Sequence, residues 1–108
     1  MLRQFASLVV VAGLAASPAI AQNAGDIGKV RDGQSCPGCN LFQAGLSYKD
    51  ASKIDLSGAR LRQSNLALTT YDDANLSGAN LSIANLFGAR FNRTNFSRAN
   101  LQNAIAVG

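Results

Sequence analysis

The feature that most constrains this chain is a five-residue repeat. It is most regular at residues 74–86, which read Ala-Asn-Leu-Ser-Gly, Ala-Asn-Leu-Ser-Ile and Ala-Asn-Leu. On an α-helix a leucine every five residues turns by about 140° from the one before, so the leucines form no stripe. On a straight strand the odd spacing sends them to alternating faces. They can all face one interior only if the chain turns a corner in every repeat, which predicts a solenoid.

The repeat keeps its register to the end of the chain. The position two before each centre is nearly always small, as at Ala59, Ala74 and Ala79. Residues two apart share a face of an extended segment, so the centre and the small residue are expected to point inward and the intervening Asn outward. Ala51 and Ala106 are small centres. The large centres form the predicted inward core: Leu41, Leu46, Leu56, Leu61, Leu66, Tyr71, Leu76, Leu81, Leu86, Phe91, Phe96 and Leu101.

Repeats such as Ala59-Arg60-Leu61 and Ala74-Asn75-Leu76 resemble the A(D/N)LXX motif of the pentapeptide repeat protein family. The resemblance covers about residues 39–107. It implies an all-β fold, a right-handed quadrilateral parallel β-helix with four pentads per turn. Residues 20 apart would then stack on adjacent coils, which places Asp73 between Lys53 and Arg93. Fourteen centres predict about three and a half coils.

Three regions are expected along the chain. Residues 1–21 have Arg3 near the start, an apolar run, and Ala19-Ile20-Ala21 before the expected cleavage site, which is the pattern of a secretory signal peptide. Residues 22–38 are a polar N-terminal tail and cap, and residues 39–108 are the β-helix. We therefore expect a secreted or periplasmic protein that has no membrane association after cleavage of the signal peptide.

Cys36 and Cys39 form a Cys-Pro-Gly-Cys motif just before the repeat. In an oxidising compartment two cysteines of a small domain usually pair, so we favour a structural disulfide. The alternative is thiol-disulfide exchange. That chemistry requires a lowered thiolate pKa, typically at a helix N-terminus, whereas repeat sequence follows this motif.

The sequence favours a protein that is not an enzyme. It contains no histidine, and two cysteines fall short of a four-ligand zinc set, so no metal, cofactor or catalytic residue is predicted. The formal charge is +4, and arginines near the C-terminus lack the interleaved aromatic residues of a nucleic-acid platform. No nucleic-acid partner is expected. DNA mimicry against a topoisomerase, known in the family, is disfavoured by the basic charge and the signal peptide.

Departures from the repeat indicate where partners would bind. Apolar residues on one outer face, Tyr48, Leu68, Phe87 and Val107, form a candidate interface. Lys49 occupies an inward position, which predicts that the side formed by residues 49–53 is distorted. The chain ends inside a coil, and the family resemblance implies a homodimer through that end. The predicted function is therefore an exported structural or protein-protein interaction module with an unknown protein partner.

Overall fold

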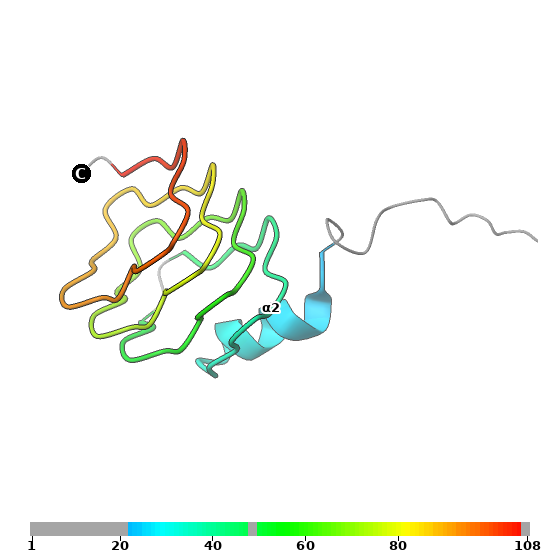
Figure 1. Ribbon diagram of the computed structural model, residues 1–108. Helices are drawn as coiled ribbons and strands as arrows, with labels where there is room; N and C mark the ends of the chain where they lie inside the picture. Colours follow the sequence, from blue (N-terminus) through cyan, green and yellow to red (C-terminus); the bar gives the residue numbers. More distant parts are fainter. Residues whose placement is uncertain (1–21, 48–49, 107–108) are drawn as a thin grey trace, which may run out of the picture.

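Figure 1 shows helix α2 followed by a stack of similar coils. The computed structural model describes residues 22–47 and 50–106; the expected signal peptide, Tyr48, Lys49 and Val107 lie outside this description. The helix, α2, spans Ala24–Arg31. The described coils contain isolated β-bridges in place of longer strands, because each side turns a corner after a few residues.

The register between coils is constant. Every bridge is parallel and joins residues 20 apart, beginning with Asn40 and Arg60. One turn of the solenoid therefore takes 20 residues, or four pentads. The N–H of Leu41 donates to the carbonyl oxygen of Arg60 (2.8 Å), and the N–H of Arg60 donates to that of Cys39 (2.9 Å). The same pair of bonds recurs along the stack and connects each coil to the next.

The corners share one backbone conformation. The residue two after the centre has φ between 55° and 71° at each described corner. Positive φ at this position is the mark of a type II turn and favours glycine. The sequence places Gly58, Gly78 and Gly88 there, yet nine non-glycine residues adopt the same conformation, including Leu68 and Ile83.

Asparagine side chains complete the hydrogen bonding of the corners. The Oδ1 of Asn75 accepts the N–H of Ser77 (3.0 Å). This local bond satisfies a donor that the turn directs away from the neighbouring coil. Equivalent bonds occur at Asn40, Asp50, Asp55, Asn65, Asn80, Asn85, Asn95 and Asn100.

The interior of the coils is filled by the centres and the small residues. The buried centres are Leu41, Leu46, Ala51, Leu56, Leu61, Leu66, Tyr71, Leu76, Leu81 and Leu86. Phe91 and Phe96 are only half-buried. Leu101 is 41% exposed, so its assignment to the core was wrong. These three residues lie in the last described coil, and a described coil contacts it on one side only.

Helix α2 covers the other end of the stack. Asn23 caps it, with Oδ1 accepting the N–H of Asp26. Ile27 and Val30 are buried against the first coil and join its core cluster. A polar tail or cap was expected here, but the helix was not. An eight-residue helix with two glycines is not stable by itself, so its contacts with the coil must stabilise it.

The coils begin earlier than the expected boundary at residue 39. The N–H of Cys36 donates to the carbonyl oxygen of Asp55 (2.9 Å), and that of Gly38 donates to Ser57 (2.8 Å). Cys36 lies five residues before Leu41 and is buried, as a centre should be. Residues 36–38 therefore form part of the first coil rather than of the tail.

Candidate functional site

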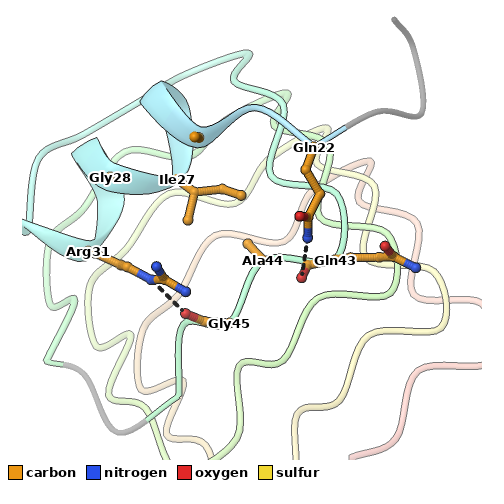
Figure 2. Close-up of a pocket in the computed structure, with 8 residues that line it drawn as sticks. Gln22, Ile27, Gly28, Arg31, Gln43, Ala44 and Gly45 are labelled. Atoms are coloured by element: carbon orange, nitrogen blue, oxygen red, sulfur yellow. Dashed lines mark hydrogen bonds between the residues drawn. The ribbon is translucent and has the colours of Figure 1, made fainter. Parts of the chain in front are cut away.

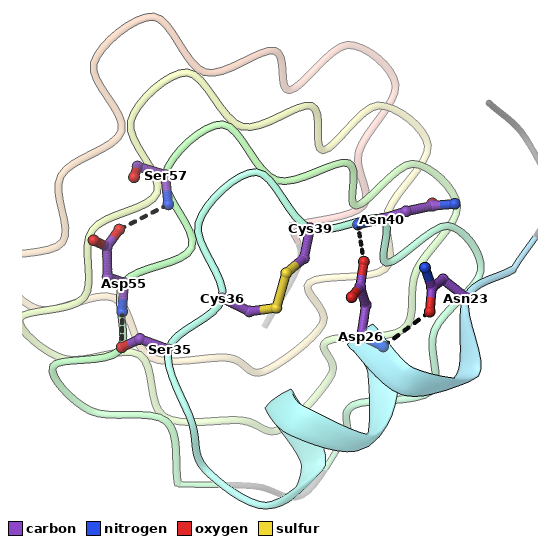
Figure 3. Close-up of a disulfide and its surroundings, with 8 residues drawn as sticks. All are labelled: Asn23, Asp26, Ser35, Cys36, Cys39, Asn40, Asp55 and Ser57. Atoms are coloured by element: carbon purple, nitrogen blue, oxygen red, sulfur yellow. Dashed lines mark hydrogen bonds between the residues drawn. A yellow bond between two sulfur atoms is a disulfide. The ribbon is translucent and has the colours of Figure 1, made fainter. Parts of the chain in front are cut away.

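The first corner of the solenoid carries the two cysteines (Figure 3). Cys36 is a buried centre and Cys39 occupies the next small position, half-buried. Pro37 and Gly38 fill the two turn positions between them, with φ of 71° at Gly38. Proline followed by glycine is the sequence that a type II turn prefers. The corner holds both side chains inward, and the two sulfur atoms form a disulfide.

Asp26 approaches this disulfide from helix α2. Its Oδ2 accepts the N–H of Asn40 at 2.9 Å, which ties the helix to the first coil. A carboxylate oxygen of Asp26 and the sulfur atoms of Cys36 and Cys39 all lie within 4.8 Å of one another. Neither the repeat pattern nor the spacing of the cysteines indicates this contact, because it depends on how α2 packs.

A cleft of about 300 Å³ lies between α2 and the first coil (Figure 2). Arg31 crosses it from the last turn of α2 and donates from Nε to the carbonyl oxygen of Gly45 (3.1 Å). At the other side Gln22 donates from Nε2 to the carbonyl oxygen of Gln43 (3.1 Å). The lining is Gln22, Ala24, Ile27, Gly28, Arg31, Gln43, Ala44 and Gly45. The hydrogen bonds across the cleft bind α2 to the coil.

Apolar side chains are exposed on the outer surface. Leu68 is 43% exposed and Phe87 is 49% exposed, so the two described members of the expected interface both face solvent. Leu68 also covers the corner of the next coil: a Cβ added at Gly88 would lie 2.7 Å from its Cδ2. Ile83 and Ile105 are exposed as well.

Among the described residues, two ion pairs join neighbouring coils. Arg90 Nη2 contacts Asp72 Oδ2 at 2.9 Å, and Arg93 Nε contacts Asp73 Oδ1 at 2.7 Å. A second bond, from Arg93 Nη2 to Asp73 Oδ2 (2.9 Å), makes the latter pair bidentate. Hydrogen bonds from Arg93, aided by its charge and that of Lys53, hold the pKa of the Asp73 carboxyl below its usual value. The expected column of charges thus forms a contact between Asp73 and Arg93.

Three aromatic rings pack together near the open end: Tyr71 and Phe91 lie in one column, and Phe96 lies on the next side of the coil. The rings of Tyr71 and Phe91 stack with centroids 5.6 Å apart, and Phe96 meets Phe91 edge-on at 5.1 Å. Burial raises the pKa of the Tyr71 phenol, so this side chain is neutral at physiological pH. Tyr71 therefore acts here as a packing residue.

A stack of coils with five-residue sides and a capped first coil defines a β-solenoid. The chain belongs to the pentapeptide repeat family: the sequence model for pentapeptide repeats matches it in eight copies, over residues 54–93 and 74–108. A search of the curated proteins found no match. The described residues hold no helix with the length and apolar character needed to cross a membrane.

Two solved structures of pentapeptide repeat proteins are similar to the chain. One comes from the thylakoid lumen of Arabidopsis thaliana; it is 23% identical, with 77% of this chain and 71% of that chain covered and a TM-score of 0.35. The other comes from the cyanobacterium Cyanothece; it is also 23% identical, with 75% of this chain and 92% of that chain covered and a TM-score of 0.29.

Proposed function

We propose that the protein is an exported, non-enzymatic repeat protein that acts as a structural or protein-protein interaction module. Pentapeptide repeat proteins are in general structural modules without catalytic activity, and membership of this family supports the proposal. We also propose that the solenoid is a right-handed quadrilateral β-helix of about three and a half coils. The 20-residue register of the bridges supports four sides per coil.

We infer the interaction role from the difference between the two ends of the solenoid. Helix α2 covers the first coil with Ile27 and Val30. At the other end the centre Leu101 is 41% exposed, and the centre Phe96 is half-buried. A solenoid end that exposes its core normally needs a cap. We infer that a second copy of this chain supplies it, which gives a homodimer through the C-terminal coil.

Light scattering of the mature protein over a range of concentrations tests the homodimer. We expect a mass that doubles as the concentration rises, and we expect Leu101→Glu to abolish the change by placing a charge in the interface. Phe87→Glu is the matched control, because it adds the same charge on the outer face. A monomer at high concentration would rule out the dimer. If Phe87→Glu abolishes association and Leu101→Glu does not, the interface lies on the outer face and the proposed C-terminal dimer is wrong.

Export is the second part of the proposal, and residues 1–21 support it with the pattern of a signal peptide. Fractionation of cells that express the full chain, with mass spectrometry of the N-terminus, is the direct test. We expect the protein outside the cytoplasm with Gln22 as its first residue. An intact chain that stays in the cytoplasm would contradict export without affecting the dimer.

We propose a structural role for the disulfide within this module. Cys36 is 3% exposed and its backbone is bonded to the second coil, so an attacking thiolate has little access to its sulfur. The bond joins two inward positions across the first corner. It would stabilise that corner, which has no coil before it.

A further inference from the structure

Three groups that bind metal ions converge at the first corner. They are the sulfur atoms of Cys36 and Cys39 and a carboxylate oxygen of Asp26, all within 4.8 Å of one another. The two cysteines come from one turn and the aspartate from α2 (Figure 3). Cys36 is buried, whereas Cys39 and Asp26 are half-buried, so the group is accessible from one side.

The corner has the spacing of a zinc-binding turn. Two cysteines separated by two residues commonly supply two ligands to one Zn²⁺, at about 2.3 Å from each sulfur. Tetrahedral coordination then places the two sulfurs about 3.8 Å apart. The Cα atoms of Cys36 and Cys39 are 5.5 Å apart, so both thiolates can reach one ion with little movement of the backbone. The sequence alone offers only these two ligands; the structure adds Asp26.

We propose that the reduced form of the protein binds one Zn²⁺ through Cys36, Cys39 and Asp26. A dithiol reductant attacks the half-buried Cys39 sulfur, transfers two electrons and two protons to the disulfide and becomes a disulfide itself. Zn²⁺ then displaces the two thiol protons and accepts the two thiolates and the carboxylate as ligands. Water takes the fourth position, since three protein ligands leave one open. The disulfide and the metal exclude each other, so metal occupancy follows the redox state.

The surroundings hold the ligands in place. The N–H of Asn40 donates to Asp26 Oδ2 and orients the carboxylate. Cys36 is fixed by the bond from its N–H to Asp55, and its carbonyl oxygen accepts the N–H of Cys39 at 3.2 Å. Hydrogen bonds of this kind around a metal site keep its ligands oriented and strengthen binding.

Metal titration of the purified mature protein tests the proposal. After reduction and removal of the reductant under nitrogen, we expect one Zn²⁺ per chain by calorimetry and elemental analysis, and none in the oxidised protein. Co²⁺ should give thiolate charge-transfer absorption together with the visible bands of tetrahedral coordination. Binding should also tighten as the pH rises, because two protons leave on binding.

Two variants separate this site from simple binding by two thiols. Asp26→Asn keeps an oxygen for the Asn40 N–H but loses the charged ligand, and it should weaken Zn²⁺ binding at least about 10-fold. Asp32→Asn removes the same charge at an exposed position just after α2 and should leave the affinity unchanged. Equal affinity of the Asp26→Asn variant and the unaltered chain would overturn the proposal.

The stoichiometry and the fold supply two further tests. One Zn²⁺ per two chains would indicate a four-thiolate site between copies and would overturn the proposal. Circular dichroism of the reduced protein shows whether the fold survives. If the reduced chain unfolds and Zn²⁺ restores the fold, the site is supported; if Zn²⁺ does not restore it, the proposal fails. None of these results depends on the dimer or on export.

Discussion

At the scale of single residues, the corner position with positive φ has the strongest conformational requirement. An L-residue in the left-handed region costs roughly 1–2 kcal/mol, and a β-branched side chain is the least suited to it. Ile83 nevertheless adopts φ of 59° there and is 44% exposed. The contacts of the surrounding coils evidently determine the backbone, and the side chain adapts to it.

Substitutions at this position should change stability in opposite directions. Gly58→Ala should lower the free energy of unfolding by about 1 kcal/mol through backbone strain alone, because no atom lies within 4 Å of the added Cβ. Ile83→Gly should raise it by a similar amount. Gly45→Ala is the control: Gly45 is not among the residues with positive φ, and an added Cβ would make only an ordinary contact at 3.5 Å. Urea unfolding measures all three, and changes of the same sign at Gly58 and Ile83 would refute the strain argument.

At the scale of elements, the coils could be predicted from the sequence and helix α2 could not. The repeat fixes which residues face inward, since the five-residue period requires a corner in each unit. Ile27 and Val30 form only a short apolar pair in a polar segment, and their partners lie in the first coil. A contact that depends on tertiary packing leaves little local signal, so the approach of Asp26 to the cysteines was missed with the helix.

Docking of α2 on the first coil should depend on Ile27. Ile27→Ala removes buried methyl and methylene groups and should lower the free energy of unfolding by about 2 kcal/mol. Hydrogen exchange should become faster for the amides of α2 before those of the middle coils, because the helix is not stable alone. Lys29→Ala, on the exposed side of α2, should leave both measurements nearly unchanged. Equal exchange of α2 in the two variants would show that the cap is held by its polar contacts.

Contacts between coils include one that depends on pH. The pKa of Asp73 is lowered in the folded protein, chiefly by hydrogen bonds from Arg93. This pair therefore stabilises the fold at pH values above the unfolded pKa of an aspartate, and the contribution is lost as the pH falls through the lower folded value. The sequence column of Lys53, Asp73 and Arg93 predicts the contact but not its bidentate geometry.

Asp73→Asn should make the free energy of unfolding depend less on pH in the acidic range. Without the carboxylate, the difference in unfolding free energy between neutral and acidic pH should be smaller than in the unaltered chain. Urea unfolding at a series of pH values measures it. The control is Asp32→Asn, which removes a carboxylate from outside the coils. Curves that stay parallel for Asp73→Asn and the unaltered chain would contradict a stabilising ion pair.

At the scale of the whole molecule, the solenoid has one covered and one open end. Each described coil pairs with the coil 20 residues before or after it, so the coils contact only their neighbours. Stability in such a stack is close to a sum over adjacent coils. The sequence repeats almost evenly, so it predicts equivalent leucines. Their burial differs because no described coil covers the far side of the last described coil.

Substitutions in one column of leucines test this difference in burial. Leu61 is fully buried, whereas Leu101, two coils further along the same column, is 41% exposed. Leu61→Ala should lower the free energy of unfolding by about 3 kcal/mol, and Leu101→Ala should lower it by less than about 1 kcal/mol in the monomer. If a second copy covers the C-terminal coil, the cost of Leu101→Ala should grow with protein concentration, because association stabilises the folded state. If Leu101→Ala lowers the free energy of unfolding only slightly at every concentration, no second copy covers the open end. If it lowers it as much as Leu61→Ala in dilute solution, Leu101 is buried in the monomer and the end is not open.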